Sequence, residues 1–472
     1  MHINTYKWVV LINMFIIHLG SKAMMLRKTI IAGVIFLSFT ATAYAGSEIE
    51  TLITMLHENG MVSDAQFGRL QAELKQNQST ANKEKQEVQK QLAEVTKPSD
   101  VEVQVKGGVT VKTRDGKFST KLGGRVQADA ATYSGDPTIG DGTEIRRARM
   151  YLNGVMYTDW AYKLEYDFAS TGANGKGIAD AFLAYNGFDD LEIKVGHFKD
   201  PFSLEQQTSS NNVSFTERSL ASAFAAGRHI GAMLSAKQQH WSLAGGVFGD
   251  TLTATNGTAH NQDEGWGLGA RATFSPINEK NKVVHFGLGL NYRDTGGLGT
   301  TSFKQQPQTH IGGINIADTG NITNVKEFYK VGAEVATVMG PFSAQAEYIT
   351  TSLSRKTASD LDFDGWYVQT GYFFTGESRN YKKGAFGSIT PKASVGEGGI
   401  GAWELALRYS TLDLIDKDID GGDVDSYTVG LNWFATATLR FSANYVDVLN
   451  VKGGTYDNQE PRLFQVRSQW AF

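Results

Sequence analysis

The chain has 472 residues, a formal net charge of −4 and no cysteine. The charge excludes an overall basic surface, so we expect no nucleic-acid partner, and the lack of cysteine excludes disulfides and thiolate metal sites. A soluble chain of this length usually divides into several domains, and one large β-barrel is the main exception. After the N-terminal region, no stretch reaches the roughly 18 apolar residues of a membrane-spanning helix, so only strands could cross a membrane.

Residues 25–45 have the three parts of a secretory signal peptide. Arg27 and Lys28 form a basic start, residues 30–39 are an apolar run, and residues 43–45 read Ala-Tyr-Ala, which is a cleavage box. We therefore expect cleavage after residue 45 and export from the cytoplasm.

Residues 1–23 precede a signal that is already complete, with its own start at Met24 or Met25. We interpret them as an over-extended gene start. The alternative is a signal with an unusually long N-terminal part. Residues 1–45 thus form the first segment of the predicted organisation.

Residues 46–97 are predicted to form a periplasmic helical leader. Apolar residues recur at helical spacing at its start, and the Asn-Gly pair at 59–60 is a helix stop. Ser63 and Gln66 then resemble a capping box that begins a second helix, which Pro98 ends. The apolar stripe of this helix is narrow and about as long as a short coiled coil, so we expect it to oligomerise. The alternative is a solvated, partly disordered spacer.

From residue 98 onward, apolar and polar residues alternate in many separate segments. In one segment Tyr427, Val429, Leu431 and Trp433 share one parity, while Ser, Thr, Gly and Asn fill the other. A period of two residues predicts strands rather than helices. One apolar, aromatic-rich face and one polar face suit a sheet that lies between lipid and water.

The alternation predicts about sixteen antiparallel strands, an even number, as single-chain bacterial barrels have. They span residues 117–133, 143–157, 159–169, 178–187, 190–198, 228–237, 240–250, 265–275, 282–294, 325–339, 341–353, 362–375, 401–412, 424–435, 437–450 and 461–472. Short links are interpreted as periplasmic turns, at 187–190, 238–239, 339–341 and 434–438. Long polar links are interpreted as extracellular loops, at 251–264, 295–324 and 376–400. A further alternating segment, 101–113, is a candidate hairpin beside the first strand.

The last predicted strand has the most characteristic pattern. Phe464, Val466, Trp470 and Phe472 fall on one parity, and long polar residues fall on the other. An amphipathic last strand that ends on a C-terminal Phe looks like that of a bacterial outer-membrane β-barrel protein. The alternative, for this segment alone, is an edge strand of a soluble sheet. With the other strands it predicts an all-β transmembrane barrel over residues 98–472.

Several longer strings stand in a fixed order between residues 100 and 472. They are Lys121-Leu-Gly-Gly-Arg-Val-Gln-Ala-Asp129, Arg146-Arg-Ala-Arg149, Tyr162-Lys-Leu-Glu-Tyr-Asp-Phe168, Gly196-His-Phe-Lys-Asp-Pro-Phe-Ser-Leu-Glu205, Thr208-Ser-Ser-Asn-Asn212, Glu217-Arg-Ser219, Phe342-Ser-Ala-Gln-Ala-Glu-Tyr348, Phe374-Thr-Gly-Glu377, Gly401-Ala-Trp-Glu-Leu405 and Asn444-Tyr445. Together these strings resemble the phosphate-selective porin O and P family. The resemblance implies a sixteen-stranded, homotrimeric porin of the bacterial outer membrane, surrounded by lipid and lipopolysaccharide, through which small anions diffuse passively. It also implies that the third extracellular loop, about residues 199–227, folds inward as the constriction.

An anion-selective pore needs cations where the water-filled passage is narrow. Strand parity and the inward loop give ten candidate pore-lining or anion-binding residues: Lys121, Arg125, Arg147, Arg149, Lys163, Lys194, Lys199, Asn211, Arg218 and Arg271. Arg125 and Arg147 also match wall arginines in the family's motifs. For any single arginine on the polar face, the alternative is a salt bridge that braces the barrel wall. That face also carries Arg408, Arg440 and Arg467.

The chain departs from the phosphate site of the family that it resembles. The family has a lysine after the Asp-Trp pair that opens the third strand, where this chain has Ala161. The family has another lysine after Thr-Ser-Ser in the inward loop, where this chain has Asn211. Each missing cation removes on the order of 2–4 kcal/mol of attraction at a partly shielded site. We therefore predict an anion porin with weaker phosphate selectivity than its relatives.

Two alternatives belong to other classes of protein. An outer-membrane enzyme would need a Ser or Thr, a His and an acid within hydrogen-bond reach. None of the 9 His lies in a Gly-x-Ser-x-Gly or His-Glu-x-x-His setting, so we expect no enzyme activity, no cofactor and no metal site. The second alternative is a structural anchor with a plugged pore, whose leader binds a periplasmic partner.

Overall fold

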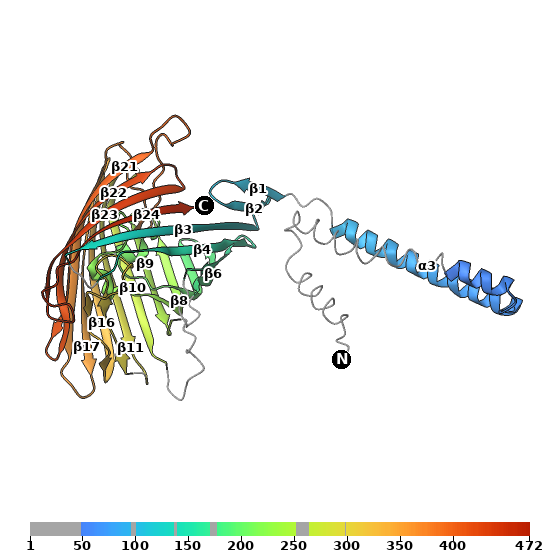
Figure 1. The fold of residues 1–472 in the computed structure, drawn as a ribbon, viewed down its shortest axis with the longest axis horizontal. Helices are drawn as coiled ribbons and strands as arrows, with labels where there is room; N and C mark the ends of the chain where they lie inside the picture. The colour runs from blue at the N-terminus through green and yellow to red at the C-terminus, as the bar shows by residue number, and fades with distance from the viewer. Residues whose placement is uncertain (1–48, 96–100, 136–138, 170–176, 252–263, 298) are drawn as a thin grey trace. The chain divides into compact units, whose positions relative to one another are not determined.

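The computed structural model describes residues 49–95, 101–135, 139–169, 177–251, 264–297 and 299–472 (Figure 1). The chain divides into two units, Met1–Gln104 with Val111–Lys117, and Val105–Thr110 with Phe118–Phe472. The signal peptide and the over-extended start that we predict within residues 1–45 lie outside the described residues. No helix in the described part of the chain is long and apolar enough to cross a membrane.

The described part of the leader contains two helices. The first spans residues 49–58, and α3 spans Asp64–Val95. The Gln66 side-chain oxygen accepts hydrogen bonds from the Ser63 amide at 3.1 Å and from the Ser63 hydroxyl at 3.0 Å. This is half of the expected capping box, and it explains why α3 begins at this point. The role of the leader stays a prediction.

Sixteen antiparallel strands form a closed barrel in the described residues (Figure 1). They are β3 (Ser119–Ser134), β4 (Gly142–Met156), β5 (Trp160–Asp167), β6 (Ile178–Phe188), β7 (Leu191–Lys199), β8 (Arg228–Lys237), β9 (Trp241–Phe248), β10 (Trp266–Glu279), β11 (Lys282–Asp294), β16 (Val325–Met339), β17 (Phe342–Arg355), β18 (Leu361–Phe373), β21 (Ala402–Asp416), β22 (Ile419–Phe434), β23 (Leu439–Lys452) and β24 (Arg462–Ala471). The barrel closes where β24 pairs with β3. The predicted barrel is therefore confirmed, with strand bounds that differ by a few residues. Two short strands precede it, β1 (Val101–Val105) and β2 (Val109–Thr113), and pair as a hairpin.

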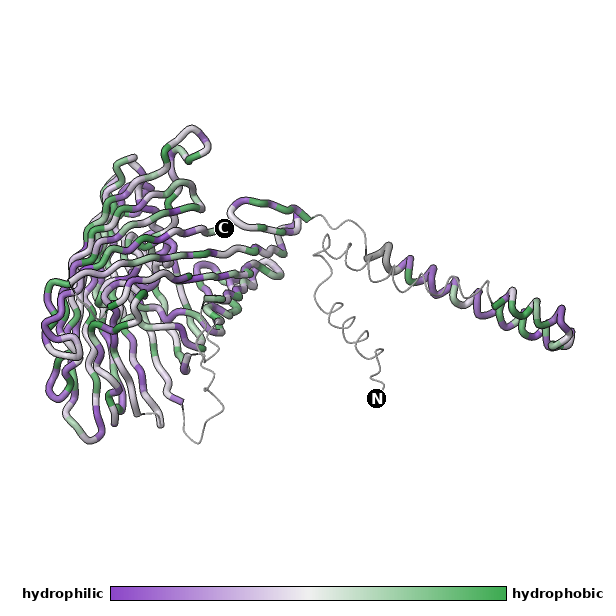
Figure 2. The backbone as a smooth tube through the Cα atoms, viewed as in Figure 1, coloured by the Kyte–Doolittle hydropathy of each residue, from purple (hydrophilic) through white to green (hydrophobic). Residues whose placement is uncertain are grey.

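Hydrophilic and hydrophobic residues alternate along many of the strands (Figure 2), and buried and exposed positions alternate with them. On β16, Lys330 and Glu334 are buried on the lumenal face, whereas Val335 is exposed on the outer face. Aromatic rings collect on the outer face near the end that carries the short turns, where Trp403 and Trp433 stack at 5.5 Å between centroids. An apolar band with aromatic rings at its edge is the surface that lipid requires.

The links between strands alternate between the two ends of the barrel. Short turns such as 340–341 lie at one end, and the long link 374–401 opens at this same end, because the Phe373 amide donates to the Pro341 carbonyl at 3.0 Å. The prediction that 376–400 is an extracellular loop is therefore wrong. The reason is strand parity: β18 is an even-numbered strand of the barrel and runs toward the end with the short turns.

In the part of the chain that the structure describes, three links fold into the lumen. They are the constriction loop 200–227, with α4 (Leu204–Gln207) and the 3-10 helix η1 (Leu220–Phe224); the second inward loop 295–324, with β12 (Thr300–Thr301), β13 (Lys304–Gln305), β14 (Ala317–Asp318) and β15 (Ile322–Thr323); and the third inward loop 374–401, with β19 (Tyr381–Lys382) and β20 (Ala385–Phe386). Phe202 and Phe303, from the first two loops, pack in one cluster with wall residues such as Leu412. Phe386 of the third loop packs with Leu204 of the first. The sequence predicted only the first of these loops, and together the three narrow the lumen from both ends.

Candidate functional site

Three wall arginines hold the constriction loop through its backbone. Arg408, Arg440 and Arg467 lie on β21, β23 and β24. Arg440 Nη1 donates to the Val213 carbonyl at 2.7 Å, and Arg408 donates to the Glu217 carbonyl at 3.1 Å. Arg467 donates to a third carbonyl of the loop. Arg408 and Arg440 thus brace the loop rather than the wall, whereas Arg467 also forms the kind of wall salt bridge that the sequence left open, with Asp129 at 2.6 Å.

Two carboxylates fix the start and the later part of the same loop. Glu347 on β17 accepts hydrogen bonds from the backbone amides of Leu204 at 2.9 Å and Glu205 at 2.6 Å. The Glu205 carboxylate accepts from the Ser219 amide at 3.1 Å and from the Ser219 hydroxyl at 2.8 Å. The loop is thus held in one conformation against one side of the barrel.

Glu217 joins the constriction loop to the wall by charge. Its carboxylate lies 2.8 Å from Arg146 Nε and 2.8 Å from Arg467 Nη2. Burial alone would raise the pKa of Glu217, but Arg146, Arg147 and Arg467 outweigh burial and hold the pKa well below its usual range. Glu217 is therefore a stable anion at neutral pH.

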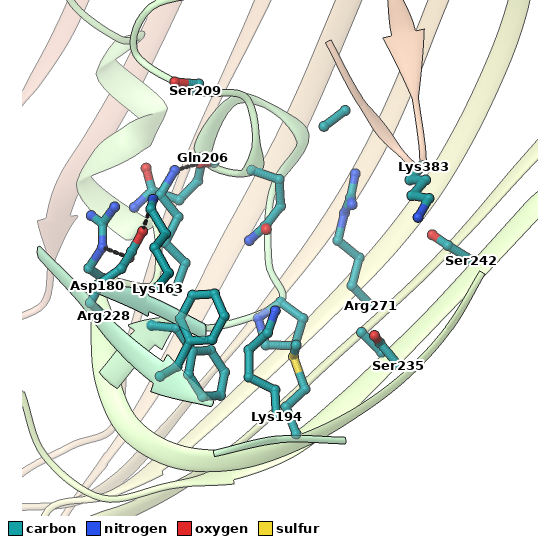
Figure 3. Close-up of a pocket in the computed structure, with 18 of the residues that line it drawn as sticks. Lys163, Asp180, Lys194, Gln206, Ser209, Arg228, Ser235, Ser242, Arg271 and Lys383 are labelled. Carbon is teal, nitrogen blue, oxygen red and sulfur yellow. Dashed lines mark hydrogen bonds and ion pairs between the residues drawn. The ribbon is translucent and has the colours of Figure 1, made fainter. Parts of the chain in front are cut away.

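A cavity of about 450 Å³ remains between the constriction loop and the wall of β3–β10 (Figure 3). One lining residue is acidic, Asp180. Eleven lining residues are basic, namely Arg125, Arg147, Arg149, Lys163, Lys194, Lys199, Arg218, Arg228, Lys237, Arg271 and Lys383. The surroundings of the cavity are therefore strongly electropositive.

Two carboxylates on the wall are shared among several of these cations. Glu165 lies 3.0 Å from Arg125, 2.9 Å from Arg149 and 2.8 Å from Lys163. Asp180 lies 2.5 Å from Lys163 and 2.6 Å from Arg228 (Figure 3). The carboxylates hold the cations in place but do not neutralise all of them.

Three lining cations bind neutral oxygens and no carboxylate in the described residues. Lys199 donates to the Gln206 carbonyl, Arg218 Nη2 donates to the Thr208 carbonyl at 3.0 Å, and Arg147 donates to a wall glutamine at 2.9 Å. Within the described residues, no carboxylate oxygen lies within 4.0 Å of these three charges. Burial lowers the pKa of Arg218, but a guanidinium stays charged in proteins. These charges are available to an anion in the cavity.

The third inward loop is tied to the opposite side of the cavity. Arg271 Nη2 donates to the Gly384 carbonyl at 2.8 Å, and its guanidinium binds Glu334 at 2.6 Å. The Tyr381 hydroxyl lies 2.6 Å from His285 Nδ1. Burial raises the pKa of Tyr381. These contacts place Lys383, which lies between Lys382 and Gly384, at the edge of the cavity (Figure 3).

Eight of the ten residues that the sequence proposed surround this cavity: Arg125, Arg147, Arg149, Lys163, Lys194, Lys199, Arg218 and Arg271. Lys121 and Asn211 do not line it. Lys121 lies near the start of β3, toward the end with the short turns, and the Asn211 side-chain oxygen instead accepts from Arg125 Nη1 at 3.1 Å.

The sequence reasoning did not find Arg228, Lys237 and Lys383. Arg228 and Lys237 lie at the two ends of the predicted strand 228–237, and Lys237 has the same parity as Ser235, which also lines the cavity. Lys383 lies in the link that was assigned to the wrong end of the barrel. The alternating direction of the sixteen predicted strands would have placed this link at the end with the short turns, although not in the cavity.

Residues 120–472 match the family model described as phosphate-selective porin O and P. The chain is 33% identical over 395 residues to Porin O of Pseudomonas aeruginosa, which covers 74% of this chain and 87% of that protein. It is 29% identical over 371 residues to an uncharacterized protein of Caulobacter vibrioides, covering 75% of this chain and 73% of that protein. Among solved structures, it is similar to an anion-selective porin from Comamonas acidovorans, with a TM-score of 0.48 and 14% identity over 75% of this chain and 100% of that chain.

Proposed function

Because the chain belongs to the phosphate-selective porin O and P family, we propose that it forms an outer-membrane channel for the passive diffusion of small anions. The observation that carries this proposal is the cavity beside the constriction loop, with eleven basic lining residues and one acidic residue. Fixed cations beside a narrow, low-dielectric passage attract anions and repel cations. The candidate residues that face this cavity are the proposed lining of the anion path.

We propose further that phosphate selectivity is weaker than in relatives that carry lysines at the two matched positions. Ala161 supplies no charge, and the amide oxygen of Asn211 is directed at Arg125. Neither position then adds a cation beside Arg125 and Arg228, which are already engaged by Glu165 and Asp180. The cations that bind neutral oxygens supply a general preference for anions.

The experiment is the reversal potential of the purified protein in planar bilayers under a potassium chloride gradient. We expect the reversal potential to have the sign of chloride permeation. We expect added phosphate to block the chloride current only weakly. Changing Ala161 and Asn211 together to Lys is expected to strengthen both the anion preference and the phosphate block. A cation-selective reversal potential would overturn the channel assignment, whereas tight phosphate block in the wild type would overturn only the weaker selectivity.

A second candidate function, a structural anchor with a closed pore, has one observation in its favour. Three loops enter the lumen, and their apolar side chains form a cluster with the wall. Single-channel conductance distinguishes the two functions, because an anchor with a closed pore gives no steps of current. We favour the channel because the cavity is lined by charge, which a plug does not need.

A homotrimer is the proposed assembly. The outer face of β3 presents the small residues Ala128, Ala130 and Thr132 beside a groove of about 870 Å³ on the outer wall, whereas Gly124 on the same face is buried against Phe472. Ile145 and Trp433 also line this groove. Small side chains let two β-barrel walls approach closely, and a large apolar groove is suited to the side chains of another copy.

A further inference from the structure

The lumenal wall of β6–β9 carries an apolar cluster where a porin lumen is ordinarily polar. It consists of Phe198, Met233 and Phe248, with Phe182 and Ala244 packed against them. Phe182 has the same parity on β6 as the lumenal Asp180, and its ring lies 6.1 Å from that of Phe198 between centroids. The cluster is therefore on the side of the water-filled passage.

Packing beneath the constriction loop accounts for only one end of this cluster. Phe248 is 1% exposed. Pro201, at the start of the loop, lies close to Phe248, because a Cβ atom built on Gly269 would be 3.0 Å from Pro201 and 3.1 Å from Phe248. Phe182 and Ala244 are only partly buried, and both line the cavity. The loop does not explain why an aromatic ring faces the cavity at Phe182.

One cation, Lys194, lies directly beside these rings, and it is also paired with Glu192 at 3.0 Å. Lys194 Nζ lies 4.8 Å from the centroid of Phe182 and 5.5 Å from that of Phe198 (Lys194 is labelled in Figure 3). Lys199 and Arg218, which line the same cavity, bind backbone carbonyls rather than carboxylates. The cavity thus has a basic side and an apolar, aromatic side within one volume of about 450 Å³.

The apolar side does not favour the binding of chloride or phosphate, because these ions have no apolar surface to bury against it. An anion with an aromatic body would use both sides: its head would meet the cations, and its ring would leave water against Phe182 and Met233. We infer that this channel preferentially binds and passes amphipathic organic anions, with a small anionic head and an aromatic body. This inference rests on the proposed anion-channel function and specifies its solute.

The test compares methanesulfonate with benzenesulfonate as blockers of chloride current in planar bilayers. The two ions have the same head and the same charge, so only the ring differs. In the wild type, benzenesulfonate is expected to half-block at a concentration about tenfold lower, equivalent to about 1.4 kcal/mol. Equal block by the two ions would overturn the inference while leaving an anion-selective channel intact. A channel without anion preference would instead overturn the proposed function.

Phe182→Ser removes the ring from the cavity without changing charge. It is expected to bring the two half-blocking concentrations within about twofold of each other. The matched control is Phe188→Ser, on the same strand but exposed and outside the cavity, which is expected to keep the wild-type ratio. A ratio that survives in Phe182→Ser, or that is lost equally in Phe188→Ser, would contradict the assignment. If Phe182→Ser does not insert, the wild-type comparison of the two sulfonates decides the matter alone.

Discussion

Asp129 and Arg467 form a two-point ion pair across the seam at which the last strand closes on the first. They lie opposite each other in the β24–β3 register, with Nε–Oδ1 and Nη2–Oδ2 distances of 2.6 Å each. Both side chains are buried, and Arg467 also reaches Glu217 of the constriction loop at 2.8 Å. One arginine therefore couples closure of the barrel to docking of the loop.

Arg467→Gln is expected to destabilise the barrel by about 3 kcal/mol, because it leaves Asp129 buried without its charge partner. The measurement is the temperature at which the protein in detergent shifts from its folded to its unfolded position on an unboiled gel. Arg462→Gln is the control, since Arg462 lies on the same strand and pairs with Asp447 in the exposed region. Exposed ion pairs contribute little to stability. Equal decreases in unfolding temperature for the two variants would therefore argue that the buried pair at the seam does not stabilise the barrel more than an exposed pair does.

Glu217 gives a prediction about pH. Its pKa in the folded protein is held below the unfolded value of about 4.3 by Arg146, Arg147 and Arg467. A depressed pKa contributes stability that is complete above the unfolded value and is lost as the pH falls through the folded value. The difference in unfolding temperature between wild type and Glu217→Gln should therefore stay constant from pH 7 to about 5 and narrow only in stronger acid.

The control for this series is Glu397→Gln, at an exposed position. It should match the wild type at every pH. If the difference in unfolding temperature between wild type and Glu217→Gln already disappears near neutral pH, another group, and not Glu217, holds the loop by charge.

Much of the barrel was predictable from the sequence. In a strand between lipid and water, residues that face lipid are apolar and residues that face water are polar, so the two kinds alternate along the chain. The predicted segment 325–339 coincides with β16. The prediction failed at the end of the strands where the second inward loop covers the lumenal face, as the burial of Leu414 beside Ile316 shows. The region 413–423 was expected to be a link, yet β21 runs to Asp416 and β22 begins at Ile419.

The interior was harder to predict, because its contacts are between residues far apart in the sequence. Phe386 is one apolar residue in a polar link, and its burial depends on Leu204 from another loop. Parity placed Arg440 in the lumen, but only the fold shows that it binds the Val213 carbonyl instead of facing the cavity. Residue types and periodicity contain neither fact.

Lys199 should contribute more to selectivity than a lysine outside the passage. Lys199→Gln removes a charge that lines the cavity and has no carboxylate partner there, so the reversal potential in a chloride gradient should move toward zero. Lys356→Gln makes the same change of charge in the link between β17 and β18, outside the cavity lining, and should leave the potential near that of the wild type. The effect of Lys199→Gln should shrink at high salt, where the screening length falls to about 3 Å. Identical shifts in the two variants would indicate a general charge effect.

Deleting residues 46–97 should leave a barrel that still conducts. The strands β3–β24 close their backbone hydrogen bonds among themselves, so the barrel does not need the leader for its fold. The measurement is the single-channel conductance of the truncated protein after refolding, against the mature full-length chain. Failure to insert or conduct would make the leader part of the pore.

The small residues on the outer face of β3 predict where copies of the chain meet. Chemical crosslinking of the wild type should give three linked copies, and an unboiled gel should show one slow band. Ala130→Trp places a large ring in the groove beside Ile145 and should release single barrels. Leu288→Trp adds a ring of the same size at an exposed outer position on β11, outside the groove, and should preserve the wild-type band.

Because each barrel encloses its own cavity, the released Ala130→Trp barrels should keep the wild-type reversal potential. A wild type that runs as a single copy would refute the assembly, and loss of the slow band in both variants would place the contact elsewhere on the wall.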